Sequence, residues 1–190
     1  MAHDVYLLRH GETEWNKDHR VQGRMNSDLT ELGRQQAARQ AGILRDLRGS
    51  IGMHRLWASP LGRAQETAGL AFGGDPFGTD PRLAEVHCGQ WEGLTPTDRM
   101  ARDPDLAAAC ETEFQMYVSA PDGERLPDIV ARASSFLNDL EAPAILVSHK
   151  ITLVVLRALL TGDGSSLDVQ NAPAQGSVLK ISNATVTVLT

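Results

Sequence analysis

The stretch Val5-Tyr6-Leu7-Leu8-Arg9-His10-Gly11 decides the fold, because an apolar run of strand type ends abruptly in a cation, an imidazole and a glycine. In an open α/β sheet, ligands bind in the crevice beyond the carboxyl ends of the strands. His10 can act there as nucleophile, base or ligand, and Arg9 offers a fixed fork of donors for phosphate or carboxylate. We expect Gly11 to allow a sharp turn and the close approach of a ligand. Three residues alone also describe a strand end with solvated side chains, so a chemical role requires partners elsewhere.

A second strand end repeats this design. The apolar run Ala144–Val147 is of the buried parallel type and is followed by Ser148 and His149. Because the ends of parallel strands face the same edge of a sheet, the two histidines are expected to meet. Arg63 follows a third predicted strand, at a helix start where backbone N–H groups favour anions. Glu85 ends a fourth, so two imidazoles, two guanidinium groups and one carboxylate are predicted to converge.

The rest of the pattern predicts alternating strands and helices. Thr30 is typical of an N-cap, and apolar residues at helical spacing predict a helix to about Arg48, ended by Gly49 and Gly52. The other predicted elements are a loop over Lys17–Asp28, strands at Arg55–Ala58 and Arg82–Val86, helices from Leu61, at Leu126–Leu140 and at Ile151–Leu160 (closed by Gly162), and a hairpin of Ser177–Ile181 and Thr185–Leu189. Alternation of this kind implies an α/β fold: a three-layer α/β/α sandwich with a mainly parallel sheet and helices on both faces.

The pattern changes between about residues 90 and 123, where prolines punctuate a segment rich in Ala, Asp and Glu. One short helix, Asp105 to Tyr117, fits this segment. It is interpreted either as a small cap inserted over the sheet or as a solvated helical connection. Residues 1–190 are expected to form a single domain in both cases. Substrate choice is assigned to this insertion, with Arg99, Arg102, Phe114 and Tyr117 as its candidate residues.

Composition excludes several classes of protein. The chain has 190 residues, 42% of them hydrophobic, which is ordinary for a globular protein. A net charge of −6 argues against a broad nucleic-acid surface, although a local basic pocket for a small anion remains compatible with it. We find no signal peptide and no membrane span. Cys88 and Cys110 lack metal-ligand spacing, so reduced thiols and a cytoplasmic location are expected, with Cys88 as buried filler.

Four motifs follow one another along the chain. They are Leu8-Arg9-His10-Gly11-Glu12-Thr13-Glu14-Trp15-Asn16, Ser59-Pro60-Leu61-Gly62-Arg63-Ala64-Gln65-Glu66-Thr67-Ala68, Leu83-Ala84-Glu85 with Gly89-Gln90-Trp91-Glu92-Gly93, and Val147-Ser148-His149. Through these motifs the chain resembles the histidine phosphatase superfamily, in the branch of phosphoglycerate mutases and related small phosphatases. The resemblance extends from about Val5 to the end of the helix after His149. It implies a phosphoglycerate mutase-like domain.

The resemblance implies that His10 is the nucleophile that accepts the phosphoryl group. Neutral imidazole suits this role when an acceptor holds its other ring nitrogen, and phosphoryl transfer otherwise requires positioning and charge stabilisation. Glu85 is implied to protonate the leaving alcohol and then to deprotonate the water that hydrolyses phosphohistidine. The residues implied to bind phosphate or substrate are Arg9, Asn16, Gln22, Gly23, Arg63, His149 and Lys150. No metal and no cofactor is implied.

Other polar and aromatic residues are interpreted as structural. The histidines expected to be bystanders are His3, His19, His54 and His87. Glu12 and Glu92 belong to the motifs, and structural hydrogen bonding is their expected role. Trp15 and Trp91 are interpreted either as core residues or as part of the pocket mouth.

Lys150 departs from the family pattern, which usually has glycine after the second histidine. If this position required a positive φ, lysine would be strained there. If it tolerates a side chain, Lys150 adds a cation at the rim and favours substrates with a second anionic group. We hypothesise the second case, for which Lys150→Gly would raise the Michaelis constant of doubly anionic substrates more than that of simple monoesters.

Three functions are compatible with these residues. The first and preferred one is a metal-independent phosphomonoesterase acting through phosphohistidine on a small phosphorylated metabolite. The second is a phosphoglycerate mutase, which needs an enclosed site, whereas this chain is short and its insertion compact. The third is a regulatory or phosphate-binding protein without turnover, which burial of His10 would favour. The expected partner is a small phosphate ester, with neither nucleic acid nor membrane, and the oligomeric state is not predicted.

Overall fold

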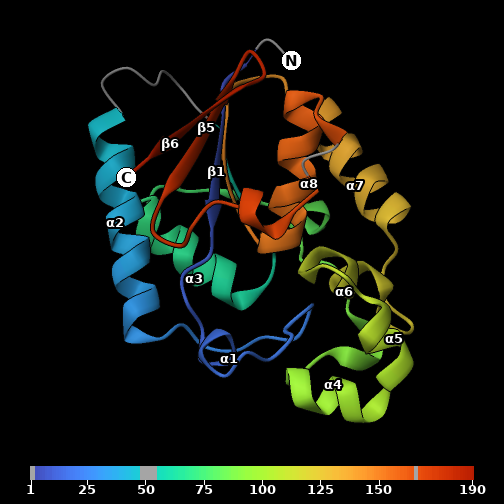
Figure 1. Cartoon of the computed structure of the whole chain (residues 1–190). Helices are drawn as coiled ribbons and strands as arrows, with labels where there is room; N and C mark the ends of the chain where they lie inside the picture. Colours follow the sequence, from blue (N-terminus) through green and yellow to red (C-terminus); the bar gives the residue numbers. More distant parts are fainter. Residues whose placement is uncertain (1–2, 48–54, 165–166) are drawn as a thin grey trace.

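The computed structural model describes residues 3–47, 55–164 and 167–190. These residues form one six-stranded sheet with helices packed around it (Figure 1). The strand order is β3-β2-β4-β1-β5-β6. The strands are β1 (Val5–Arg9), β2 (Arg55–Ala58), β3 (Gly78–Thr79), β4 (Ala144–Ser148), β5 (Val178–Ser182) and β6 (Thr185–Leu189). The pairs β1–β4, β4–β2 and β2–β3 are parallel, and the hairpin β5–β6 continues the sheet antiparallel to β1. The sheet is therefore mainly parallel, as predicted.

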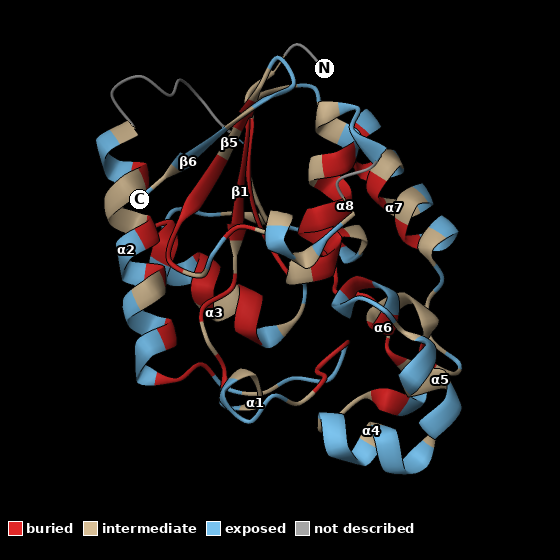
Figure 2. Ribbon diagram, viewed as in Figure 1, coloured by how far each residue is buried: buried red, intermediate tan, exposed pale blue. Residues whose placement is uncertain are grey.

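Helices cover both faces of this sheet. Helices α2 (Glu31–Leu47) and α3 (Gly62–Ala71) lie on one side, and α7 (Leu126–Asn138) and α8 (Lys150–Thr161) lie on the other (Figure 1). Alternate side chains of β1 enter the two cores, since Val5 and Leu7 belong to the α7–α8 cluster and Tyr6 and Leu8 to the α2–α3 cluster. Figure 2 shows β1 as largely buried, whereas the edge strand β6 and the outer faces of the helices are exposed or intermediate. The predicted three-layer α/β/α sandwich is confirmed.

The residues that we expected at the ends of helices and in the hairpin turn mostly occupy those positions. The Thr30 hydroxyl accepts from the Gly33 amide at 3.0 Å as α2 begins, and Gly162 closes α8 in the left-handed conformation. Asn183 and Ala184 have positive φ in the β5–β6 turn. Gly49 and Gly52 lie outside the described residues.

Two predictions of local structure were wrong. Arg82–Val86 is no strand; Pro81–Leu83 forms the 3₁₀ helix η1, and the Asp80 carboxylate accepts from the Arg82 amide at 2.8 Å. Proline at the first helical position and an aspartate cap favour a helical turn over extension, and β3 takes this edge of the sheet. Glu85 therefore lies in an irregular segment, not at a strand end.

The insertion contains three helices where we predicted one, Asp105–Tyr117. They are α4 (Pro96–Arg102), α5 (Pro104–Ala109) and α6 (Glu113–Ser119), preceded by the 3₁₀ helix η2 (Gly89–Trp91). Pro104 starts a new helix directly after α4, and capping boxes at Thr95 and Thr112 start α4 and α6. The three helices lie together beyond the carboxyl end of the sheet (Figure 1). We continue to propose that they are a cap within one domain.

Two further short helices lie in the loops. Helix α1 (Glu14–Lys17) follows β1 with a capping box at Thr13, and the 3₁₀ helix η4 (Val169–Asn171) precedes β5. We did not predict either of them. Among the described helices none has the length and apolar character needed to cross a membrane.

Candidate active site

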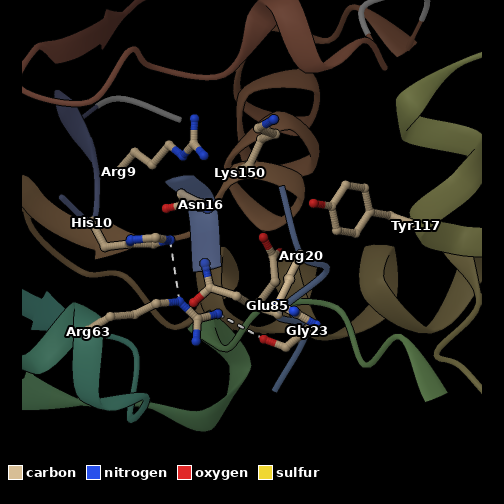
Figure 3. Close-up of a pocket in the computed structure, with 10 residues that line it drawn as sticks. Arg9, His10, Asn16, Arg20, Gly23, Arg63, Glu85, Tyr117 and Lys150 are labelled. Carbon is tan, nitrogen blue, oxygen red and sulfur yellow. Dashed lines mark hydrogen bonds between the residues drawn. The ribbon is translucent and has the colours of Figure 1, made fainter. Parts of the chain in front are cut away.

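A polar cleft lies beyond the carboxyl ends of β1 and β4 (Figure 3). The side chains that line it are Arg9, His10, Asn16, Arg20, Gln22, Gly23, Arg63, Glu85, Tyr117 and Lys150. Adjacent strand ends explain the convergence, since Arg9 pairs with Ser148 and the His10 amide donates to the Ser148 carbonyl at 3.0 Å. Every predicted site residue except His149 therefore lines this cleft.

His10 is held as a neutral imidazole whose Nε2 is deprotonated. Its Nδ1 lies 2.7 Å from the Gly11 carbonyl, so Nδ1 carries the proton that is donated there. The Nε2 atom accepts from Arg63 Nε at 3.3 Å, the contact drawn in Figure 3. Burial, followed by the charges of Arg63 and Arg9, lowers the pKa of His10 well below its ordinary value. A deprotonated Nε2 facing cations is suited to attack phosphorus.

His10 is buried although it lines the cleft. Its exposed fraction is only 3%, the feature that we associated with a protein without turnover. The same residue nevertheless lines the cleft together with both arginines. Neighbouring side chains cover the ring without closing the cleft.

The two arginines are held in different ways. Arg9 Nε is buried and has no hydrogen-bond partner within the described chain, so this guanidinium is available to an anion. Arg63 donates Nη1 to the Met25 carbonyl at 2.7 Å and Nη2 to the Gly23 carbonyl at 2.8 Å. Burial lowers the pKa of Arg63 to about 10, so it remains a cation at neutral pH. Arg63 is thus a fixed charge beside His10 Nε2, and Arg9 is the less constrained one.

Glu85 lies at the N-terminus of α8. Its Oε2 accepts from the Ile151 amide at 3.2 Å, and its Oε1 accepts from the amides of Thr152 at 3.2 Å and Val86 at 3.0 Å. The Thr152 hydroxyl donates to the Ala84 carbonyl at 2.7 Å, which fixes the Glu85 segment against the helix. These contacts orient the carboxyl group, although the segment that carries it is not a strand.

His149 lies close to His10 but does not line the cleft. The two ring centroids are 5.1 Å apart, and His149 is fully buried. Its Nε2 lies 2.7 Å from the Ser59 hydroxyl, and its Nδ1 has no partner in the described residues. Donation from His149 to a phosphoryl oxygen remains a prediction.

The loop after β1 supplies three neutral residues of the cleft, Asn16, Gln22 and Gly23. Asn16 Oδ1 accepts from the Thr13 amide at 3.2 Å, which leaves the Asn16 amide hydrogens available to a ligand. Gln22 donates to the Thr13 hydroxyl at 2.7 Å. Gly23 has a φ of +53°, and a Cβ there would lie 2.1 Å from Glu92 Oε1, so this position requires glycine. The loop shape thus places the carbonyl that holds Arg63.

Sequence reasoning missed two contributors to the site. Gln175, just before β5, donates to the His10 carbonyl and to Asn16 Oδ1, both at 3.2 Å. Arg20 lines the cleft while donating to the Gly93 carbonyl at 3.0 Å. Neither residue lies at an element end with a chemical signal, so the sequence alone offered no reason to select them.

Lys150 is the first residue of α8, where φ is helical, so the strained alternative is excluded. Its Nζ pairs with Glu113 of α6 at 2.7 Å. Gly11 has no positive φ, so its backbone conformation does not by itself require glycine; a Cβ there would lie 2.2 Å from the Gly33 carbonyl oxygen. Close packing against α2 is what requires glycine at position 11.

Several residues that we interpreted as structural make structural contacts. Glu12 accepts from the Thr30 hydroxyl at 2.9 Å, and Glu92 accepts from the amides of Arg24 at 2.8 Å and Cys88 at 3.0 Å. Trp91 is fully buried in the core, as is Cys88, whose pKa burial raises well above the ordinary value. The described residues hold no group of three His, Cys, Asp or Glu side chains placed to bind a metal.

The four substrate-choice candidates lie in different places. Tyr117 lines the cleft, and Arg99 lines a neighbouring cavity. Arg102 instead bonds to Gln90 at the surface, and Phe114 belongs to the core, so neither reaches a ligand site. His54 lies outside the described residues, and His19 is exposed on a loop.

Comparison with known proteins places this geometry in a family context. A model of the histidine phosphatase superfamily (branch 1) matches residues 5–190. A glucosyl-3-phosphoglycerate phosphatase of Mycolicibacterium vanbaalenii is 32% identical, over 92% of this chain and 79% of that protein. A Yersinia pestis protein named "Probable phosphoglycerate mutase GpmB" is 35% identical, over 83% of this chain and 74% of its own. The α-ribazole phosphatase structure from Shigella flexneri superposes with a TM-score of 0.81 at 28% identity, covering 97% of this chain and 94% of that one.

Proposed function

The chain belongs to branch 1 of the histidine phosphatase superfamily, and from that premise we propose that it is a metal-independent phosphomonoesterase acting through phosphohistidine at His10. The observation that carries the proposal is the state of this imidazole. Its Nδ1 proton is donated to a carbonyl, and its Nε2 lies beside the fixed Arg63 cation in a polar cleft. A small phosphate ester is the substrate that this cleft fits.

The first proposed step transfers the phosphoryl group to the protein. His10 Nε2 attacks phosphorus, so that a P–N bond forms as the ester P–O bond breaks. Glu85, in its protonated form, gives its proton to the leaving alcohol oxygen. Arg9, whose Nε has no partner in the described chain, donates hydrogen bonds to the equatorial phosphoryl oxygens. Arg63, beside His10 Nε2, stabilises the negative charge on the same oxygens.

The second step returns the enzyme to its starting state. Glu85, now a carboxylate, takes a proton from water as the water oxygen attacks phosphorus. The P–N bond breaks, inorganic phosphate leaves, and the electron pair returns to His10 Nε2. Over both steps one ester and one water give one alcohol and one phosphate.

A mutase is the alternative that one comparison favours, since one relative is named as a probable phosphoglycerate mutase. A mutase must retain its phosphorylated intermediate and return the group to the same carbon skeleton. The relative named as a glucosyl-3-phosphoglycerate phosphatase and the phosphatase-named structure support hydrolysis instead. The two activities differ in their products, and one assay separates them.

The test is phosphate release from a panel of phosphomonoesters, 3-phosphoglycerate included, in the presence of a chelator. We expect release that survives the chelator and falls at least about 10³-fold in His10→Ala. His3→Ala, which removes a histidine far from the cleft, serves as the control and keeps full activity. With substrate labelled in its phosphoryl group, we expect an acid-labile, base-stable label on the wild-type chain and none on His10→Ala.

Three outcomes would contradict the proposal. Loss of activity in chelator would contradict metal independence. Isomerisation of 3-phosphoglycerate without phosphate release would favour the mutase. No turnover and no label on His10 would favour the phosphate-binding protein.

A further inference from the structure

A second cavity opens next to the polar cleft. The two share Asn16, Arg20, Tyr117 and Lys150 as lining residues. The cavity extends from them to the insertion, where Arg99 and Met116 form part of its wall. A phosphate bound at His10 would therefore have the organic part of its ester in this cavity.

The cavity carries an excess of positive charge. Arg20, Arg99 and Lys150 line it, against one carboxylate, Glu113. Arg99 forms no ion pair in the described chain; its guanidinium carbon lies 5.6 Å from the centre of the Trp91 ring, and its buried Nε has no hydrogen-bond partner. Apolar side chains such as Met116 line the same space. An organic group bearing an anion suits this lining better than a neutral polar group does.

Lys150 joins the two sides of the cavity. It begins α8 directly after His149, while its partner Glu113 begins α6 of the insertion. The Lys150 Nζ to Glu113 Oε1 distance is 2.7 Å, and the two side chains are 22% and 41% exposed. A partly exposed ion pair contributes little to stability, about 0–1 kcal/mol. A ligand carboxylate can therefore replace Glu113 at low cost.

We propose that this cavity receives the leaving group and that Lys150 binds an anionic substituent on it, which displaces the Glu113 carboxylate. The substrate class is then a phosphomonoester whose alcohol part carries a carboxylate. Glu113 acts as an internal competitor for Lys150: a ligand carboxylate must displace it, whereas an ester with a neutral alcohol leaves the ion pair intact. This inference rests on the proposed function, because it needs the phosphate of the same ester at His10.

The test measures binding in the His10→Ala background, where turnover does not interfere. Calorimetry compares 3-phosphoglycerate with glycerol 3-phosphate, which has a hydroxymethyl group in place of the carboxylate. A longer pair, 4-carboxyphenyl phosphate and 4-carbamoylphenyl phosphate, makes the same comparison further from phosphorus. We expect at least one pair to favour its carboxylate member by about tenfold, the value of a charge-assisted hydrogen bond.

Single substitutions assign that preference to residues. Lys150→Gln is expected to weaken the carboxylate ester about tenfold and its neutral partner much less. Glu113→Gln is expected to strengthen the carboxylate ester about threefold, because Lys150 loses its competitor. Lys17→Gln, at an exposed lysine outside both cavities, controls for the loss of one positive charge and is expected to change neither affinity.

The outcomes separate this inference from the proposed function. Equal losses for both members of each pair in Lys150→Gln, or weaker carboxylate binding in Glu113→Gln, would overturn the inference. Absence of phosphate release by the chain with His10 intact would overturn the proposed function, whatever the binding data show. Because the two variants are expected to act in opposite directions, general damage to the fold would not reproduce the predicted pattern.

Discussion

At the scale of single residues, the two buried histidines determine how the site responds to pH. Burial, then the charge of Arg63, lowers the pKa of both His10 and His149 well below the ordinary value. Both rings are therefore neutral in the folded chain at neutral pH. In the unfolded chain they regain an ordinary pKa near 6.5. Below that pH the unfolded state binds more protons than the folded state does.

This difference predicts that the free energy of unfolding falls as the pH drops below about 6.5. Each histidine contributes a slope of up to about 1.4 kcal/mol per pH unit until its folded pKa is reached. Urea unfolding at several pH values between 7.5 and 5.5 measures the slope. We expect His10→Asn and His149→Asn each to remove about half of the slope that the two buried histidines contribute to the unfolding free energy. An unchanged slope in both variants would show that other groups cause it.

Gln175 tests whether a residue without a sequence signal supports the reaction. It donates to the His10 carbonyl and to Asn16 Oδ1, two groups that flank the nucleophile. Gln175→Ala removes two hydrogen bonds of about 1 kcal/mol each, so we expect kcat/KM for phosphate release to fall about fivefold to tenfold. The control is Gln35→Ala on the exposed face of α2, which is expected to keep wild-type kinetics. Equal kinetics in both variants would make Gln175 dispensable.

At the scale of elements, prediction succeeded where one apolar run forms one buried strand. Strands β1 and β4 are such runs, and each was placed to within one residue. Arg82–Val86 has a strand-like composition, but the Asp80 cap and Pro81 start a 3₁₀ turn first. The insertion has weak apolar periodicity. The bounds of its three helices are set by local caps, which the prediction did not take into account. In both segments, hydrogen bonds from local side chains to the backbone set the secondary structure, and composition alone did not predict it.

The contact between α2 and the loop after β1 depends on two facing glycines. A Cβ on Gly33 would lie 2.1 Å from the Glu12 carbonyl oxygen, whereas a Cβ on Gly42 in the same helix meets nothing within 4 Å. We expect Gly33→Ala to lower the free energy of unfolding by about 2 kcal/mol or more. Gly42→Ala is expected to raise it by about 0.5–1 kcal/mol through helix propensity. Chemical denaturation of both variants checks this, and a stabilising Gly33→Ala would contradict the close approach.

At the scale of the whole molecule, the sequence predicted which residues form the site better than how they are held. The strand ends and motifs identified nine site residues, eight of which line one cleft. The sequence could not show that Glu113, thirty-seven positions before Lys150, pairs with it across the cavity. It also could not show that His149 is buried and does not line the cleft. Such pairings depend on how helices pack, which no local pattern encodes.

One ion pair connects parts of the chain that surround the site. Arg132 of α7 donates to the Glu124 carboxylate at 2.7 Å, to the Arg82 carbonyl at 2.6 Å and to the Thr152 hydroxyl of α8 at 3.3 Å. Glu124 in turn lies 3.4 Å from Arg24, in the loop beside Gly23. The charges of this pair are largely buried, with side-chain exposures of 13% and 12%.

Arg132→Met therefore leaves a buried carboxylate without its main partner, and we expect the free energy of unfolding to fall by about 3 kcal/mol. The matched control is Arg34→Met, whose ion pair with Glu66 has a similar distance of 2.9 Å but exposures of 45% and 38%. Solvent screening limits that loss to about 1 kcal/mol or less. Urea unfolding at neutral pH compares the two variants directly. Equal losses would mean that burial does not set the strength of the Arg132 connection.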